Sequence, residues 1–181
     1  MDTNPPPIPS GLASDDKLTP VMIYTETSLI RGQAVTKENV RVNIWLRTQG
    51  APEFIHLKNA QVISYTGPGP LQPVTFIDYF LPTGQVLGFH TLPPANETLD
   101  YDETEKNRKM EPISALIGNF RVAAHMRMSS LMNLGTNLEV SRIVFLSLYD
   151  VEITNPYIPG MGVVKAPMML VRMSHVSYGN R

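Results

Sequence analysis

Several arginines in this chain are placed where a guanidinium group could bind an anion. Arg41 and Arg127 occupy matching places in two similar stretches, each nine residues after a glycine (32 to 41, 118 to 127). A guanidinium group presents five donors in a planar arrangement that matches phosphate oxygens. Trp45 alternates with two of the arginines on one face of a predicted strand, and its ring could stack on a nucleic-acid base. The candidate residues for nucleic-acid or anion contact are Arg41, Trp45, Arg47, Arg127 and Arg172.

The same arginines also have a structural interpretation. Arg127 could pair with Asp150 across neighbouring strands, and Asn59 would then replace the acid in the first stretch. Residues that recur in a repeated fold usually serve that fold. We therefore favour the structural pair over anion contact.

The other residue types that could do chemistry are scattered. The chain has no cysteine, which excludes disulfides, thiolate metal sites and cysteine nucleophiles. Its histidines show no i, i+4 pair of the kind that binds zinc, and no serine-nucleophile, phosphate-loop or dinucleotide motif is present. We expect no catalytic residue, no metal and no cofactor. The histidines are His56, His90, His125 and His175.

An internal repeat decides the predicted organisation of the chain. In both copies the spacing from glycine to arginine is nine residues and the spacing from phenylalanine to leucine is three. A fixed repeat indicates two copies of one structural unit. Gly32 should therefore superpose on Gly118, and the apolar residues of the repeat should be buried. The residues expected in the core are Val42, Phe54, Leu57, Met128, Phe145 and Leu148.

Short alternating segments separated by glycine and proline turns fill both copies. Val40–Arg47 alternates with a period of two and predicts a strand, whereas residues 128–134 could form a strand or a helical turn. Many short strands with no convincing helix are typical of a small barrel or sandwich. The predicted parts are a Pro-rich arm at 1–18, a first β-barrel repeat at 19–93, an acidic linker at 94–112 and a second β-barrel repeat at 113–181.

Each copy resembles a small five-stranded barrel of the Sm-like or SH3-like kind. The comparable stretches are Asn39–Asn43 and His125–Ser129, each with apolar residues around a polar one. The later Sm-like signature, apolar-Arg-Gly, is matched only by Val171–Met173, where methionine replaces the glycine. The resemblance implies an all-β fold of two tandem small barrels related by internal duplication.

The second copy is also similar to an uncharacterised bacterial family of small β domains. That family has an Arg-apolar-Ser segment, here Arg127–Ser129, followed by a Phe-apolar-x-Leu-x-Asp-apolar segment, here Phe145–Val151. These motifs are short and structural. The resemblance therefore implies a fold and no activity.

Methionine is concentrated in the second copy, where it could line a surface that binds a partner. Methionine is adaptable and suits surfaces that bind varied partners, although an ordinary core is the simpler explanation. The segment that follows Pro167 fits an edge strand that could pair with another chain. The candidate partner-edge residues are Met168, Met169 and Leu170.

Composition narrows the function classes. The net charge of −1 gives no general attraction to nucleic acid, and no apolar run is long enough to span a bilayer. The first 20 residues lack the basic start and apolar core of a signal peptide, so we expect a cytoplasmic protein with no membrane insertion.

We favour a non-catalytic β module that acts as a scaffold or assembly subunit through a protein partner or its own copies. An Sm-like nucleic-acid-binding module is the alternative, and a small-ligand-binding protein or enzyme ranks below both. The arm and the linker are expected to mediate contacts rather than join a core.

Overall fold

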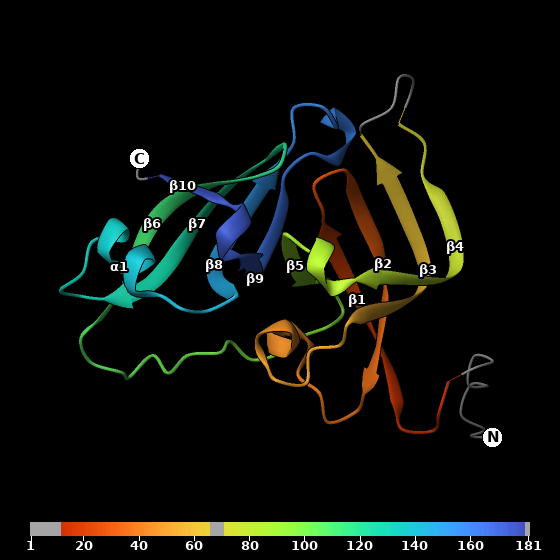
Figure 1. Ribbon diagram of the computed structural model, residues 1–181, viewed down its shortest axis with the longest axis horizontal. Helices are drawn as coiled ribbons and strands as arrows, with labels where there is room; N and C mark the ends of the chain where they lie inside the picture. The colour runs from red at the N-terminus through yellow and green to blue at the C-terminus, as the bar shows by residue number, and fades with distance from the viewer. Residues whose placement is uncertain (1–11, 66–70, 180–181) are drawn as a thin grey trace.

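The computed structural model describes residues 12–65 and 71–179, and its ten strands form one continuous antiparallel sheet (Figure 1). The strand order is β10-β6-β7-β8-β9-β5-β1-β2-β3-β4, so β4 and β10 are the outer strands at opposite ends. The all-β prediction is confirmed. The strands are β1 Asp16–Tyr24, β2 Ser28–Lys37, β3 Phe54–Ser64, β4 Val74–Pro82, β5 Gly88–Thr91, β6 Arg108–Ile117, β7 Phe120–Ser129, β8 Phe145–Thr154, β9 Val164–Arg172 and β10 Ser177–Gly179.

The helices in the described ranges are short and connect strands. The single α-helix begins after Asn133, whose side chain accepts a hydrogen bond from the backbone N–H of Thr136 and so caps the first turn. None of these helices has the length and apolar content needed to cross a membrane. The helices are α1 Leu134–Val140 and the 3₁₀ segments η1 Val42–Arg47, η2 Thr83–Gln85, η3 Pro159–Met161 and η4 Met173–His175.

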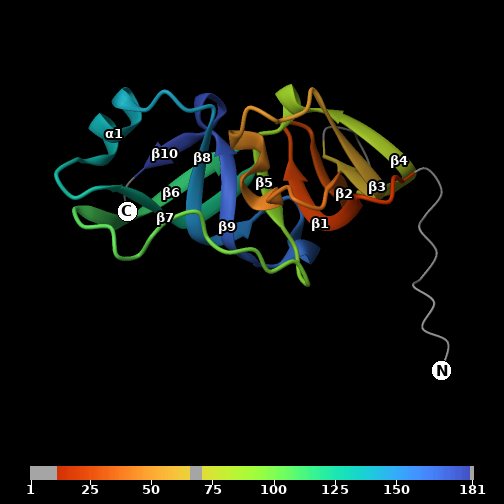
Figure 2. The same cartoon turned by 90° about the horizontal axis from the view of Figure 1, so that it is seen from below.

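The sheet consists of two halves with the same strand order. The first half runs β5-β1-β2-β3-β4 and the second runs β10-β6-β7-β8-β9. The halves lie side by side in Figure 2 and are joined where β5 pairs with β9. In this joint Gly88 lies opposite Val171 and Phe89 lies opposite Leu170.

Both halves contain a β-bulge at the same place. The register between β2 and β3 shifts next to Asn59, and the register between β7 and β8 shifts next to Asp150. Both residues have positive φ angles, 50° and 49°. Asn and Asp are the non-glycine residues that best tolerate this left-handed conformation, so a backbone requirement explains why they recur.

The predicted superposition of Gly32 on Gly118 is wrong. Gly32 lies inside β2 opposite the bulge, where an added Cβ would come within 3.3 Å of the Cα of Ala60. Gly118 lies in the tight turn between β6 and β7 with a φ of 55°. By strand register, the counterpart of Gly32 is Ala124. The equal glycine-to-arginine spacing is therefore a coincidence, because Arg41 precedes η1 whereas Arg127 lies in β7.

The predicted strand at Val40–Arg47 is also wrong, because most of it forms η1. Its buried residues include Val42, Trp45 and Leu46, a spacing that suits a helical turn. The carboxylate of Glu97 accepts hydrogen bonds from the backbone N–H groups of Val42 (2.9 Å) and Asn43 (2.6 Å). This distant side chain satisfies N–H groups that the first turn leaves free, which favours the turn over a strand.

The core predictions are confirmed with one exception. Phe54 is 54% exposed, because it begins β3 opposite Pro82 beside the outer strand. The two cores also extend into each other: Tyr149 and Leu170 pack with the first half, and Tyr24 packs with the second. The halves are therefore bound by apolar packing as well as by strand pairing. The residues that are buried as expected are Val42, Leu57, Met128, Phe145 and Leu148.

The boundaries of the predicted arm and linker need correction. Residues 108–112 of the predicted linker belong to β6, and Leu99 and Tyr101 pack against the core. The linker is therefore partly a core segment rather than a surface connection. Of the predicted arm, residues 1–11 lie outside the described residues and residues 16–18 begin β1.

Candidate functional site

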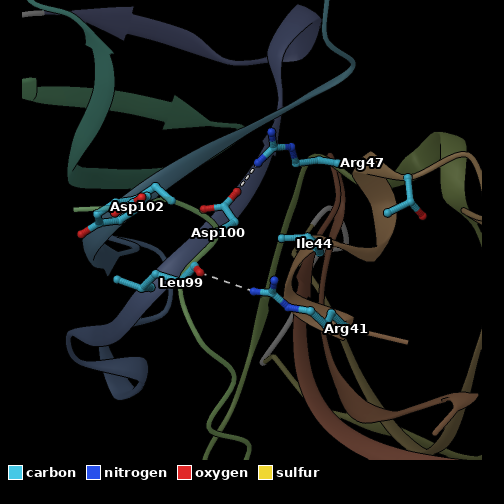
Figure 3. Close-up of a pocket in the computed structure, with 8 residues that line it drawn as sticks. Arg41, Ile44, Arg47, Leu99, Asp100 and Asp102 are labelled. Carbon is cyan, nitrogen blue, oxygen red and sulfur yellow. Dashed lines mark hydrogen bonds and ion pairs between the residues drawn. The ribbon is translucent and has the colours of Figure 1, made fainter. Parts of the chain in front are cut away.

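A cluster of polar groups ties the linker to both halves of the sheet. The side chain of Asp100 is 6% exposed and pairs with the guanidinium group of Arg47 in η1 (Figure 3). From β8, the hydroxyls of Ser147 and Tyr149 each donate a hydrogen bond of 2.7 Å to the same carboxylate. Burial and the hydrogen bond to Asp100 raise the pKa of Tyr149, which keeps the phenol protonated. Both carboxylate oxygens are occupied, so this cluster acts as a structural tie.

Arg41 lies beside this cluster and holds the linker backbone. Its Nη2 atom donates to the carbonyl oxygen of Thr98 (2.7 Å) and, as Figure 3 shows, to that of Leu99 (3.4 Å). An open cavity of about 470 Å³ lies between the linker and η1, and its lining includes Asp102 as well as Asp100. The carboxylates offset the positive charge of the arginines in this cavity. This arrangement disfavours an anion at that place.

Trp45 does not have the predicted position on an exposed strand face. Its ring is 8% exposed within the first core, and its Nε1–H donates to the carbonyl oxygen of Gly50 (3.3 Å). Base stacking requires an accessible ring face. The platform predicted from Arg41, Trp45 and Arg47 is therefore not assembled.

Arg127 and Arg172 also bind groups within the chain. Arg127 pairs with Glu105 (2.6 Å) and lies over the ring of Tyr101. The predicted Arg127–Asp150 ion pair is wrong, because the Asp150 side chain is 79% exposed and lies 3.6 Å from His125. Arg172 donates from Nε to the carbonyl of Val86 (2.8 Å) and from Nη2 to that of Thr83 (2.6 Å). It thereby connects β9 to the end of the first half.

The predicted partner edge at Met168, Met169 and Leu170 is wrong. These residues lie in β9, which is flanked by β8 and β5, and all three are buried. A local apolar run looks the same in an inner strand and in an edge strand. The position of β9 depends on how the two halves join.

Among residues 12–65 and 71–179, the sheet edge with an apolar surface and no neighbouring strand is β4. Ile77 is 78% exposed and Phe80 is 57% exposed, and other large apolar side chains lie beside them. Successive strand residues point to opposite faces, so these side chains surround the edge. Exposed apolar groups on an edge strand are unusual in a soluble protein unless a partner covers them. We call Phe54, Val74, Phe76, Ile77 and Phe80 the β4 patch.

The one charged residue of β4 is bound to its own sheet. The Asp78 Oδ1 atom lies 2.6 Å from both the His56 Nε2 and the Lys58 Nζ atoms of β3. Lys58 and then His56 hold the pKa of the Asp78 carboxyl below its usual value. The His56 ring stacks on Phe80 with centroids 4.4 Å apart. In the sequence, the only sign of this patch is the low charge of the segment that forms β4.

The remaining titratable groups do not form a reactive cluster. Within residues 12–65 and 71–179, no three His, Asp or Glu side chains are arranged to hold a metal ion. His90 is buried and lies 3.0 Å from the hydroxyl of Tyr24, and burial lowers the pKa of His90. His90 therefore remains neutral and contributes to the core.

Comparison of the chain with protein-family models, curated proteins and solved structures found no match. The features that bear on function are therefore the β4 patch and the internal pairing of the charged groups.

Proposed function

We propose that this protein is a non-catalytic assembly subunit that binds another protein chain along the free edge of β4. The exposure of the β4 patch carries this proposal. A long edge strand presents unpaired N–H and C=O groups, and an added strand from another chain can satisfy them. Natural edges are usually protected by charges or by short length. β4 is nine residues long and carries only Asp78 as a charged residue.

The engagement of the other candidate groups supports a non-catalytic role. Arg47 and Asp100 bind each other, and Arg127 binds Glu105. The partner carboxylate offsets the positive charge of each arginine, which weakens its attraction for an anionic substrate or nucleic acid. The Sm-like nucleic-acid alternative also loses its stacking residue, since Trp45 is buried.

We also propose that the two halves arose by duplication of one Sm-like or SH3-like unit. The shared strand order and the shared bulge support this origin. Asn59 and Asp150 are 91 positions apart, as are Leu57 and Leu148. Both pairs lie in the matching strands β3 and β8, and an equal offset within matching strands is expected when one unit is copied in tandem.

Native fractionation of cell extracts tests the assembly function. The full chain is expressed at its natural level, and its apparent mass is compared with the 20.1 kDa of a monomer. We expect the wild type in a larger complex and an Ile77→Lys/Phe80→Lys variant at the monomer position. Tyr157→Lys is the matched control, because Tyr157 is an exposed aromatic residue in the loop after β8 and is not part of the β4 patch.

A wild type that migrates as a monomer would refute the proposed function. The same conclusion holds if the doubly substituted chain stays in the complex. Because Ile77 and Phe80 are both exposed, the melting temperature should be nearly unchanged, and this is checked on each purified variant.

A further inference from the structure

In each half of the described sheet, the fourth and fifth strands lie at the two edges. One such strand from each half forms the internal joint, and the other two are the outer strands of the whole sheet. At the joint, the fourth strand of the second half, β9, pairs with the fifth strand of the first half, β5. The outer strands are the fourth strand of the first half, β4, and the fifth strand of the second half, β10. They lie at opposite ends of the molecule and do not meet within one chain (Figure 1).

We propose that β4 of one chain pairs with β10 of a second copy, so that chains associate head to tail and repeat the internal joint. This inference rests on the proposed function and names the partner. Because the two edges differ, each added copy leaves a free edge at either end, and the assembly grows as a filament unless its ends meet and close a ring.

Strand register gives the expected contacts. Phe89 of β5 lies opposite Ile23 of β1, and Tyr178 of β10 lies opposite Ala115 of β6. Tyr178 is therefore the counterpart of Phe89. Leu170 of β9 lies opposite Ser147 of β8, and Phe80 of β4 lies opposite His56 of β3. Phe80 is therefore the counterpart of Leu170. The internal pairs Phe89–Leu170 and Gly88–Val171 therefore correspond to intermolecular pairs Tyr178–Phe80 and Ser177–Leu81.

The exposure of these residues agrees with an edge strand that lacks its partner strand. Leu170 is fully buried where β5 lies beside it, whereas its counterpart Phe80 is 57% exposed. In the internal joint, η1 also lies against β9. The corresponding connection of the second half contains α1 and exposes Leu131 and Val140. Apolar side chains are therefore available on both sides of the proposed contact.

The proposed contact is weaker than the internal joint. Arg172 reinforces the internal joint through the carbonyl groups of Thr83 and Val86, and its register counterpart on β4 is Pro82. A proline side chain cannot donate hydrogen bonds. The two bonds are absent from the intermolecular contact, so association is reversible and rises with protein concentration.

Site-directed cross-linking tests the pairing, because the chain has no cysteine of its own. Phe80→Cys and Tyr178→Cys are placed in separate full-length chains, because these two positions lie opposite each other in the proposed register; Phe80 is exposed and Tyr178 is half-buried. The two proteins are mixed at a concentration where sedimentation velocity detects oligomers, and a short bis-maleimide is added. We expect a covalent dimer in the mixture, at least tenfold above either protein alone. Tyr157→Cys replaces Tyr178→Cys in the matched control mixture.

The outcomes separate this inference from the proposed function. A dimer formed by Phe80→Cys alone indicates symmetric pairing of two β4 strands and overturns the head-to-tail arrangement. A purified chain that stays monomeric, while cell extracts contain a complex that depends on β4, also overturns it and leaves the proposed function standing with a different protein partner. A monomer in both settings refutes both.

Discussion

Replacing Asp100 with alanine tests whether the linker is part of the fold. The wild-type carboxylate is buried and binds Arg47, Ser147 and Tyr149, which come from both halves. Removing one member of a buried ion pair costs about 3–5 kcal/mol. Arg47 is about a third exposed and regains some hydration, so the lower end of that range applies to the charge alone. The hydroxyls left without their acceptor move the expected loss upward.

Urea denaturation monitored by circular dichroism measures this loss in the free energy of unfolding. For a chain of this size, it corresponds to a fall in melting temperature of roughly 6–20 °C. Asp102→Ala is the matched control, since the Asp102 carboxylate accepts its side-chain and backbone hydrogen bonds from Thr104 at an exposed position. It should change the free energy of unfolding by less than about 0.5 kcal/mol.

A double-mutant cycle with Tyr149→Phe tests the mechanism behind the loss. Because Tyr149 donates to Asp100, the combined loss should be smaller than the sum of the single losses by about 0.5–3 kcal/mol. Equal costs for Asp100→Ala and Asp102→Ala would show that the linker is a surface connection. Strict additivity with Tyr149→Phe would show that the hydrogen bond contributes nothing to stability.

Three further predictions follow from burial, backbone conformation and titration. Leu148→Ala should cost about 2–5 kcal/mol in urea denaturation, and the exposed Phe54→Ala should cost under about 1 kcal/mol; similar costs would contradict the core assignment. Asn59→Val should cost at least about 1 kcal/mol, because a β-branched residue resists a φ of 50°, whereas Asn59→Gly should be tolerated; the reverse order would exclude the bulge. Burial lowers the pKa of His90, so the unfolded chain binds the proton more readily, and stability should fall as the pH drops from about 6.5 toward the lower pKa of the folded state. His90→Gln should flatten that part of the pH–stability profile, and an unchanged slope would assign it to other groups.

Some features of this protein follow from local sequence alone. Alternating apolar residues and glycine or proline turns specify the strand class, because these preferences act within a few residues. The shared spacing of Phe54 and Leu57 with Phe145 and Leu148 identified β3 and β8 as corresponding strands. The matching of Asn59 with Asp150 was also visible, although its cause is a bulge rather than an ion pair.

Other features depend on contacts between distant residues. Val42–Arg47 forms η1 because Glu97, more than fifty positions away, binds its first N–H groups. Met168 lies in an inner strand and Ile77 in an edge strand only because the second half joins the sheet at β5. Local periodicity reports which side of a strand is apolar and carries no information about which strands lie beside it. The tertiary structure therefore decided which strand lies at the edge of the sheet. The sequence by itself determined only that strands form there.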